Sequence, residues 1–259
     1  STQAKTLFPY TTLFRSGQQR PHNFTPARAV AFFQRVTVDF TAHQSVEDAR
    51  AFYSSLKNRL PAHGRSSDSL KILPGVSPVV GRTQAEAQEK FEQLQSLIEP
   101  SVGLGLLSNF VGGFDFSSYP LDGPVPDLPP TEGWQSRQAL FLGVARRENL
   151  TLRQLYQRVA TARGHWTVVG TPQSIADELE HWFTTGAADG FNVMAPTLPY
   201  DLQDFVALVI PELQRRGLFR TAYTGRTLRE HLGLPRPAHP AQLRRRTLEA
   251  TPQGAALAA

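Results

Sequence analysis

The segment 151–220 constrains the fold more than any other part of this sequence. It contains His165-Trp166-Thr167-Val168-Val169-Gly170-Thr171-Pro172, in which a short apolar run ends just before a proline. Proline is favoured at the first position of a helix, so this run predicts a buried strand that leads directly into a helix. Gly186 is placed to end that helix, and 190–194 predicts a second short strand. A strand–helix–strand order of this kind is typical of a parallel α/β sheet.

The stretch 35–98 predicts two more strand–helix units. Apolar and polar residues alternate from 36 to 41, which predicts a strand of about six residues. Ser45 is a suitable N-cap for the helix that follows, and Pro61 ends this helix. A second strand is predicted at 70–73, and 76–80 either extends it or forms the loop above it. Thr83-Gln84-Ala85-Glu86 has the pattern of a capping box and predicts a helix through Ile98.

Residues 99–133 interrupt this alternation, because glycine and proline are too frequent there for continuous regular structure. We predict an insertion with one short helix at 104–110. Helices resume at 136–148 and 152–162, and Thr151-Leu152-Arg153-Gln154 forms a second capping-box sequence before the latter. Asp201 is the predicted N-cap of a last helix, which Pro211 is expected to kink.

The composition excludes several classes of protein. The chain has no cysteine, which excludes disulfides, thiolate catalysis and cysteine-ligated zinc or iron–sulfur sites. No apolar run is long enough to span a membrane and no signal peptide is recognisable, so we expect a cytoplasmic location. The histidines show no paired ligand spacing, and no metal site is predicted.

The positive charge of the chain is concentrated near its C-terminus. Residues 215–246 contain nine arginines and one glutamate, so the rest of the chain is slightly acidic. A basic block can bind nucleic acid, but this one has no interleaved aromatic residues and no adjacent DNA-binding motif. We interpret 221–259 as a solvated basic tail and keep nucleic-acid binding as an alternative function.

The first residues differ in character from the rest. Residues 1–33 show neither helical nor strand periodicity, and Thr6–Ser16 resembles a translated sequencing adapter. We therefore predict that 1–33 is a non-native or unstructured leader and that 34–220 forms the folded domain.

Several motifs, taken together and in their order, resemble one protein family. They are Lys71-Ile72-Leu73-Pro74-Gly75, Pro78-Val79-Val80-Gly81-Arg82-Thr83, Arg146-Arg147-Glu148-Asn149-Leu150-Thr151, Thr167-Val168-Val169-Gly170-Thr171-Pro172, Gly186-Ala187-Ala188-Asp189-Gly190-Phe191-Asn192 and Pro211-Glu212-Leu213-Gln214-Arg215-Arg216-Gly217-Leu218-Phe219-Arg220. These motifs are similar to the C-terminal part of flavin-dependent monooxygenases of the bacterial luciferase-like superfamily, in the group of nitrilotriacetate monooxygenase component A and dibenzothiophene sulfone monooxygenase. The similarity covers residues 38–237.

The resemblance implies a TIM (β/α)8 barrel with an insertion, of which this chain holds the C-terminal part, so that the barrel is incomplete. It also implies a two-component enzyme that uses O2 and reduced FMN, supplied by a separate flavin reductase, to oxygenate a small organic substrate. Homodimers are implied for the full-length form. The family's phosphate-binding loop lies in the N-terminal half, which has no counterpart here. We therefore expect this chain alone to bind FMN weakly and to be inactive by itself.

Site residues are expected at the C-terminal ends of the strands, where barrel enzymes place them. Phe40 and Thr41 end the first predicted strand, and Val168, Val169 and Gly170 precede a helix. The resemblance implies that these five residues contact the flavin. The alternative for each is ordinary core packing.

Four further residues are candidates for the substrate pocket. His43 and His165 are the imidazoles closest to the proposed site segments, and either could orient a substrate or act as a general base. Asn192 and Met194 end the last predicted strand and could line the same pocket, although methionine is more often a core residue. No catalytic residue is assigned, and a non-catalytic, partner-binding module of the same fold stays open as an alternative.

Overall fold

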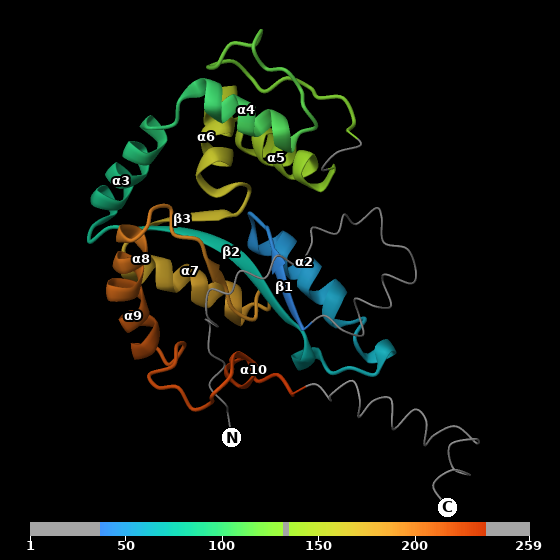
Figure 1. Cartoon of the computed structure of the whole chain (residues 1–259), viewed down its shortest axis with the longest axis vertical. Helices are drawn as coiled ribbons and strands as arrows, with labels where there is room; N and C mark the ends of the chain where they lie inside the picture. The colour runs from blue at the N-terminus through green and yellow to red at the C-terminus, as the bar shows by residue number, and fades with distance from the viewer. Residues whose placement is uncertain (1–36, 132–134, 237–259) are drawn as a thin grey trace, which may run out of the picture. The chain divides into compact units, whose positions relative to one another are not determined.

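The computed structural model describes residues 37–131 and 135–236 (Figure 1). The chain divides into two compact units, 1–222 and 223–259. The predicted leader and residues 237–259 of the predicted tail lie outside the described residues. In the second unit the structure describes one short helix, α10 (Leu228–His231), which begins with a capping box formed by Thr227 and Glu230.

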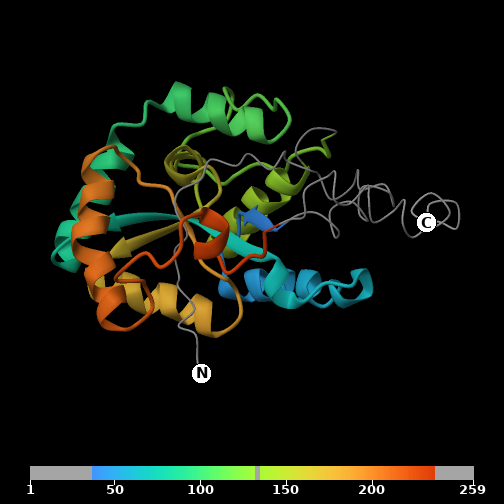
Figure 2. The same ribbon diagram turned by 60° about the horizontal axis from the view of Figure 1, so that its bottom comes forward.

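The first unit contains a parallel sheet of four strands. They are β1 (Val38–Thr41), β2 (Lys71–Val80), β3 (Trp166–Gly170) and β4 (Asn192–Val193). β2 is the central strand and pairs in parallel with the other three. Figure 2 shows the arrows of β2 and β3 pointing in the same direction. The predicted parallel α/β class is confirmed.

Because β2 has three partners and a strand has two edges, two of the partners share an edge. The main-chain N–H groups of Lys71 and Gly81 donate to Thr37 and Gly170, whereas the carbonyl of Val76 accepts from Met194. Alternate residues of a strand direct their hydrogen bonds to opposite edges. It follows that β1 and β3 lie one after the other along one edge of β2, and that β4 lies along the other edge (Figure 1).

This strand order makes the sheet open. In a closed (β/α)8 barrel each strand pairs with the strands before and after it in the sequence. Here β4 pairs with β2 instead of β3, so no described strand pairs with the outer edge of β3. The arrangement is that of an incomplete barrel, as predicted.

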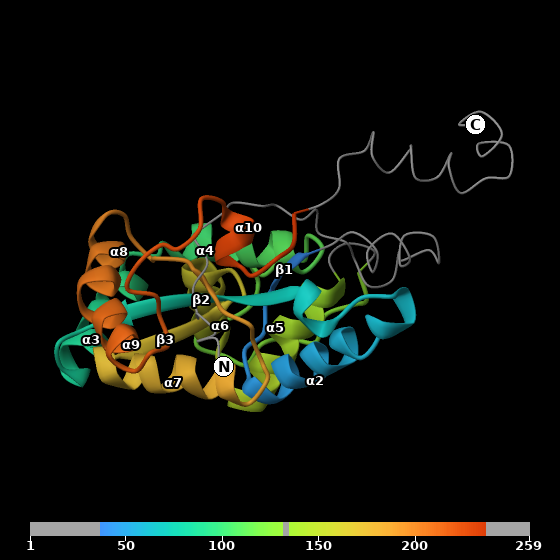
Figure 3. The same cartoon turned by 90° about the horizontal axis from the view of Figure 1, so that it is seen from below.

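Helices α2 (Val46–Lys57) and α7 (Pro172–Thr184) lie side by side on one face of the sheet (Figure 3). The register places Val76, Val80 and Val168 on that face. Together with the apolar sides of α7 and of the C-terminal helices they form the main core, whose buried members are Ala49, Val76, Val80, Val168, Ile175, Ala176, Leu179, Trp182, Ala187, Ala188, Phe191, Phe205, Val209 and Leu213.

The helix starts follow the sequence signals closely. The side chains of Ser45, Thr83, Thr151 and Thr171 each accept a hydrogen bond from the main-chain N–H three residues later. These caps begin α2, α3 (Gln84–Ser96), α6 (Leu152–Ala162) and α7. Helix α5 (Gln135–Glu148) begins one residue before its predicted start.

Two element boundaries were predicted wrongly, and the sequence left the end of β2 open between two alternatives. β1 has four residues in the described chain, and α2 ends at Lys57, with single turns at Pro61–His63 and Ser67–Ser69 before β2. β2 continues through Pro74 to Val80. Proline has no N–H group to donate to a neighbouring strand. The nitrogens of Pro74 and Pro78 face the edge of β2 on which β4 lies, and β4 pairs with β2 only at Gly75 and Val76, so the two prolines are tolerated.

The insertion shares a second hydrophobic core with the two helices that follow it. Its helix α4 (Pro100–Phe110) is longer than predicted, and 111–131 contains no helix or strand. The buried residues of this core come from α4, α5, α6 and the loop between them, and are Leu107, Val111, Phe116, Phe141, Ala145, Leu152, Leu155, Tyr156 and Val159. The glycines and prolines of 99–131 therefore shape a packed loop around helices.

The last helix also differs from its prediction. It begins at Tyr200, one residue before the expected cap, and the carboxylate of Asp201 instead accepts hydrogen bonds from Thr197. After α8 (Tyr200–Asp204), a π-helical turn at Phe205–Val209 precedes α9 (Ile210–Arg215). The wider turn accommodates Pro211, whose nitrogen cannot donate to the preceding turn.

Candidate functional site

The end of β1 meets the start of β3 through two aromatic rings. The imidazole of His165 stacks on the ring of Phe40, with ring centroids 4.8 Å apart and planes 5° apart. His165 is 6% exposed, whereas Phe40 is 37% exposed. Gly75 of β2 lies against this pair, because a Cβ atom there would come within 2.5 Å of His165 Nδ1 and 2.8 Å of Phe40. Glycine at this position therefore permits the stack.

Four buried polar atoms around this stack have no hydrogen-bond partner among the described residues. They are Thr41 Oγ1, His43 Nε2, Gln44 Oε1 and His165 Nδ1. A buried, unsatisfied polar group costs about 1–3 kcal/mol, and such groups gather where a ligand supplies the missing partner. Gln44 also ties this strand end to β3, because its Nε2 donates to the carbonyl of His165 at 2.9 Å. We refer to these residues and Phe40 as the strand-end cluster.

The imidazoles of the strand-end cluster are neutral at pH 7. The pKa of His165 is lowered to about 4, first by burial and second by the charge of Arg137, against a hydrogen bond with the Thr41 main chain that raises it. Burial also lowers the pKa of His43, against the attraction of Asp48. Burial raises the pKa of Asp39, on β1, to about 6. A charged ligand group would therefore meet little opposite charge from these imidazoles.

The predicted flavin residues fall into two groups. Thr41 lies opposite Pro74 on β2, whereas Gly170 lies opposite Val80. Six residues of strand separate these positions, or about 20 Å. The structure therefore brings Phe40 and Thr41 together with His165 and places His43 against Phe52 of α2, whereas 168–170 lies farther along the sheet.

Within the second group, the side chains point in different directions. Val168 belongs to the core against α7, and Val169 points to the opposite face of the sheet. A Cβ atom at Gly170 would lie 2.3 Å from Ser174 Oγ, so this residue packs against the start of α7. A shallow cavity of about 390 Å³ follows the outer edge of β3, lined by residues 166–169 together with Gln84, Ser174, Asp177 and Glu178.

Asn192 joins the first group, because it lies opposite Gly75 and therefore on the same face as Phe40. Its Nδ2 donates to the carbonyl of Leu73 at 3.3 Å. The main-chain N–H of Met194 donates to Val76 at 2.8 Å, which places Met194 directly after the short β4.

A buried ionic network holds the N-terminal end of β2 in place. Lys57 Nζ lies 2.7 Å from Asp189 Oδ2 and donates to the carbonyls of Ser67 and Leu70. Asp189 also accepts from Tyr53 Oη and from the main-chain N–H of Ile72. This network lies at the N-terminal end of β2, and it joins α2 to the loop before β4.

Several residues that shape the site could not be recognised from the sequence. Gln44 and Gly75 gave no periodic signal, since their roles depend on contacts between distant segments. Arg137 was read only as part of a helix, yet its charge acts on His165. Within residues 37–131 and 135–236, no group of three histidine or acidic side chains is placed to hold a metal ion, and no helix is long and apolar enough to cross a membrane.

Comparison with known proteins gives a consistent group of relatives. The chain is 53% identical over 201 residues to nitrilotriacetate monooxygenase component A from Aminobacter aminovorans, covering 77% of this chain and 44% of that protein. It is 47% identical over 204 residues to N-acetyl-S-(2-succino)cysteine monooxygenase from Bacillus subtilis, covering 78% and 46%. It is 41% identical over 206 residues to dibenzothiophene-sulfone monooxygenase from Rhodococcus erythropolis, covering 76% and 44%. No family model matches the chain.

Solved structures agree with these relatives. DmoA from Hyphomicrobium sulfonivorans superposes with a TM-score of 0.70 at 27% identity, covering 81% of this chain and 44% of that one. A riboflavin lyase solved with modified FMN and riboflavin gives a TM-score of 0.65 at 27% identity, covering 84% and 48%. The chain spans less than half the length of the relatives that it matches.

The parallel strands, their covering helices and a polar cluster at the strand ends define a protein of the (β/α)8-barrel class. Within that class, the chain is homologous to part of the flavin-dependent monooxygenases of the bacterial luciferase-like superfamily, in the group of nitrilotriacetate monooxygenase component A and dibenzothiophene-sulfone monooxygenase.

Proposed function

We propose that this chain is part of a two-component monooxygenase that uses reduced FMN and O2 to oxygenate a small organic substrate. The observation that carries the proposal is the 53% identity over 201 residues with nitrilotriacetate monooxygenase component A. The word "component" in that name supports a separate reductase as the source of reduced FMN. The structure of riboflavin lyase with modified FMN supports a flavin as the cofactor.

The strand-end cluster has the chemistry that a flavin ring needs. An isoalloxazine has two flat faces and a polar edge, so it requires an apolar wall beside hydrogen-bonding groups. The partly exposed ring of Phe40 offers the wall, Gln44 Oε1 offers an unused hydrogen-bonding position beside His165, and Thr41 Oγ1 offers another at the end of the same strand. We assign Phe40, Thr41 and Gln44 as the residues that would hold the ring in the complete enzyme.

His43 and His165 would then face the substrate. At pH 7 a neutral imidazole can accept or donate a hydrogen bond without adding charge, so each can orient a substrate beside the flavin. When bound, reduced FMN supplies the electrons that activate O2. The protein's part is to exclude water and fix the substrate's position. The end of β3 would contact the flavin only if the complete barrel brings it to the same ring. On that condition we keep Val168, Val169 and Gly170 as proposed flavin contacts.

The phosphate of FMN needs groups other than those of the strand-end cluster. Phosphates are usually held by main-chain N–H groups at a helix start or by hydroxyl and guanidinium groups. The resemblance assigns that loop to the N-terminal half of the family, so this chain alone is expected to bind FMN weakly. The two alternatives, a non-catalytic module and a nucleic-acid-binding protein, have no relative among the proteins named above to support them.

The test is oxygen incorporation by a polypeptide that joins the N-terminal half of nitrilotriacetate monooxygenase component A to residues 37–259. It is supplied with a flavin reductase, NADH, FMN and ¹⁸O2, and the products of nitrilotriacetate and of a sulfone substrate are analysed by mass spectrometry. The proposal expects ¹⁸O in a product that depends on FMN, and much less from this chain alone. FMN binding without any product would support the non-catalytic module instead.

A further inference from the structure

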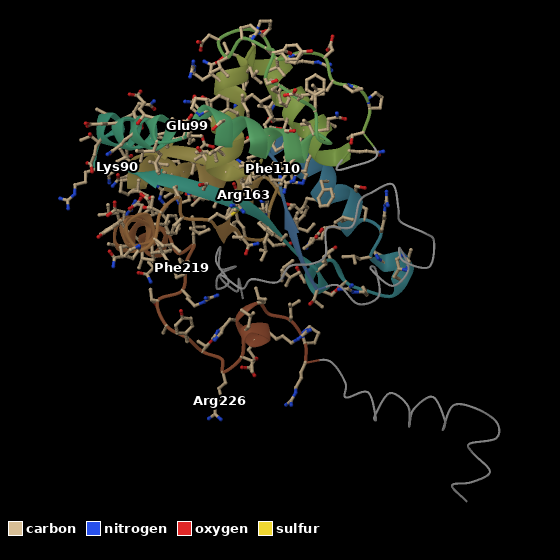
Figure 4. All side chains as sticks on the ribbon, turned by 45° about the horizontal axis from the view of Figure 1, so that its top comes forward. Lys90, Glu99, Phe110, Arg163, Phe219 and Arg226 are labelled. Carbon is tan, nitrogen blue, oxygen red and sulfur yellow. The ribbon has the colours of Figure 1, made fainter. Side chains whose placement is uncertain are left out.

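A guanidinium group without a carboxylate partner lies beside the strand-end cluster. Arg137 on α5 donates through Nη1 to the carbonyl of Arg163 at 2.8 Å. A Cβ atom at Gly164, the residue before His165, would come within 2.6 Å of the same Nη1. Arg163, labelled in Figure 4, ends α6 between the strands and the helices of the insertion.

The charge of Arg137 is not neutralised within the described chain. None of the ion pairs among residues 37–131 and 135–236 includes it. The group is nevertheless partly removed from water, and this burial lowers its pKa. A charge held away from water without a counter-ion is costly and normally pairs with an anion.

A purely structural role explains only part of this placement. By donating to Arg163, Arg137 satisfies one of the free carbonyls at the end of α6 and lies favourably at the negative end of that helix. A guanidinium has five N–H donors in a planar fork, and this contact uses one of them. The remaining donors suit a second, bidentate partner, and carboxylates match that geometry best.

The neighbouring residues direct such a partner toward the strand-end cluster. His165 lies next in the chain to Gly164, and its buried Nδ1 has no partner among the described residues. The stacked ring of Phe40 covers the other side of the imidazole. An anion on Arg137 would therefore belong to a molecule whose remaining part reaches His165 and Phe40.

We propose that Arg137 binds a carboxylate group of the substrate and so restricts the enzyme to carboxylate-bearing small molecules, with His165 as the neighbouring hydrogen-bonding group. This inference rests on the proposed function for the identity of the bound molecule as a substrate. The binding site itself is defined by residues of this chain alone.

The test is calorimetric titration of the full chain with succinate, and with succinamide as the neutral probe of the same length. The variant is Arg137→Met, which keeps the length of the side chain and removes the charge. The matched control is Arg146→Met on the same helix, since Arg146 is 69% exposed and pairs with Asp127. We expect succinate to bind at least tenfold more tightly than succinamide, a loss of at least tenfold in Arg137→Met, and no change in Arg146→Met.

Thermal unfolding separates binding from stability. Arg137→Met must stay folded at the temperature of the titration, because it loses the hydrogen bond to Arg163 together with an unpaired, partly buried charge. Equal binding of succinate and succinamide, or succinate binding unchanged in Arg137→Met, would overturn the proposal. Carboxylate binding that depends on Arg137, in a joined polypeptide that forms no oxygenated product, would retain the site and refute the proposed function.

Discussion

His165 and Phe40 stack face to face at 4.8 Å, although Phe40 belongs to the first described strand and His165 directly precedes the third. The stack closes the junction at which β1 ends and β3 begins along the same edge of β2. It also leaves His165 Nδ1 buried and unpartnered among the described residues. The strand order therefore creates the strand-end cluster.

Gly75→Ala should disrupt this stack. Its Cβ would come within 2.5 Å of His165 Nδ1 and 2.8 Å of Phe40, so at least one ring must move. Overpacking of this kind costs about 1–3 kcal/mol, and we expect a loss of that size in urea unfolding. The control is Gly143→Ala on α5, where a Cβ meets nothing within 4 Å. A Gly75→Ala protein as stable as the control would show that the stack is not tightly packed.

Two groups with opposite pKa shifts should make stability depend on pH in opposite directions. For His165, whose pKa falls from 6.5 to about 4, the unfolded chain binds more protons between these values, so acidification destabilises the protein. For Asp39, whose pKa rises from 3.8 to about 6, the folded chain binds more protons, so acidification stabilises it. Each shift corresponds to about 3 kcal/mol.

The variants His165→Asn and Asp39→Asn separate the two effects. Between pH 6.5 and pH 4, His165→Asn should gain stability relative to wild type, and Asp39→Asn should lose it, when the free energy of unfolding is measured by urea titration at each pH. The double variant should follow wild type closely. If both single variants kept the wild-type pH profile, neither group would be shifted as described.

Lys57→Met should destabilise the chain strongly. The ammonium is 5% exposed and neutralises Asp189, whose carboxylate is also largely buried. Breaking a buried ion pair by removing one partner costs about 3–5 kcal/mol. Lys90→Met is the control, because Lys90 is about one-third exposed and pairs with Glu86 and Asp204 near the surface, where about 1 kcal/mol or less is expected. Equal losses in the two variants would show that the Lys57 pair is not specially buried.

Thr151→Ala should weaken the start of α6. The Thr151 hydroxyl accepts from Gln154 N, and the Gln154 side chain returns a hydrogen bond to Thr151 N. Loss of such a cap costs about 1 kcal/mol. Thr151→Ser keeps the hydroxyl and should keep the wild-type melting temperature, as measured by circular dichroism. A Thr151→Ser protein as unstable as Thr151→Ala would assign the effect to the methyl group instead.

The local signals in the sequence predicted most elements, because caps and apolar periodicity act within a few residues. Ser45, Thr83, Thr151 and Pro172 mark helix starts that the structure confirms. Whether 76–80 extends β2 could not be decided from the sequence, since the tolerance of Pro74 depends on which edge a neighbouring strand occupies. No local pattern carries that information.

The candidate site was predictable only in part, for the same reason. Strand-end position pointed to Phe40 and Thr41, and these lie in the strand-end cluster. Gln44, Gly75 and Arg137 act through contacts with segments far away in the sequence, which periodicity cannot show. The assignment of Val168, Val169 and Gly170 to the flavin stays a prediction, and Val168 packs into the core against α7.

The most direct test of the account is FMN binding by the joined polypeptide described above, measured by flavin fluorescence. Phe40→Ala is compared with Tyr119→Ala, because Phe40 is 37% exposed and Tyr119, in the insertion, is 38% exposed. We predict that Phe40→Ala raises the Kd for FMN at least tenfold and that Tyr119→Ala leaves it unchanged. An unchanged Kd in Phe40→Ala would contradict the assignment of the strand-end cluster as the flavin site.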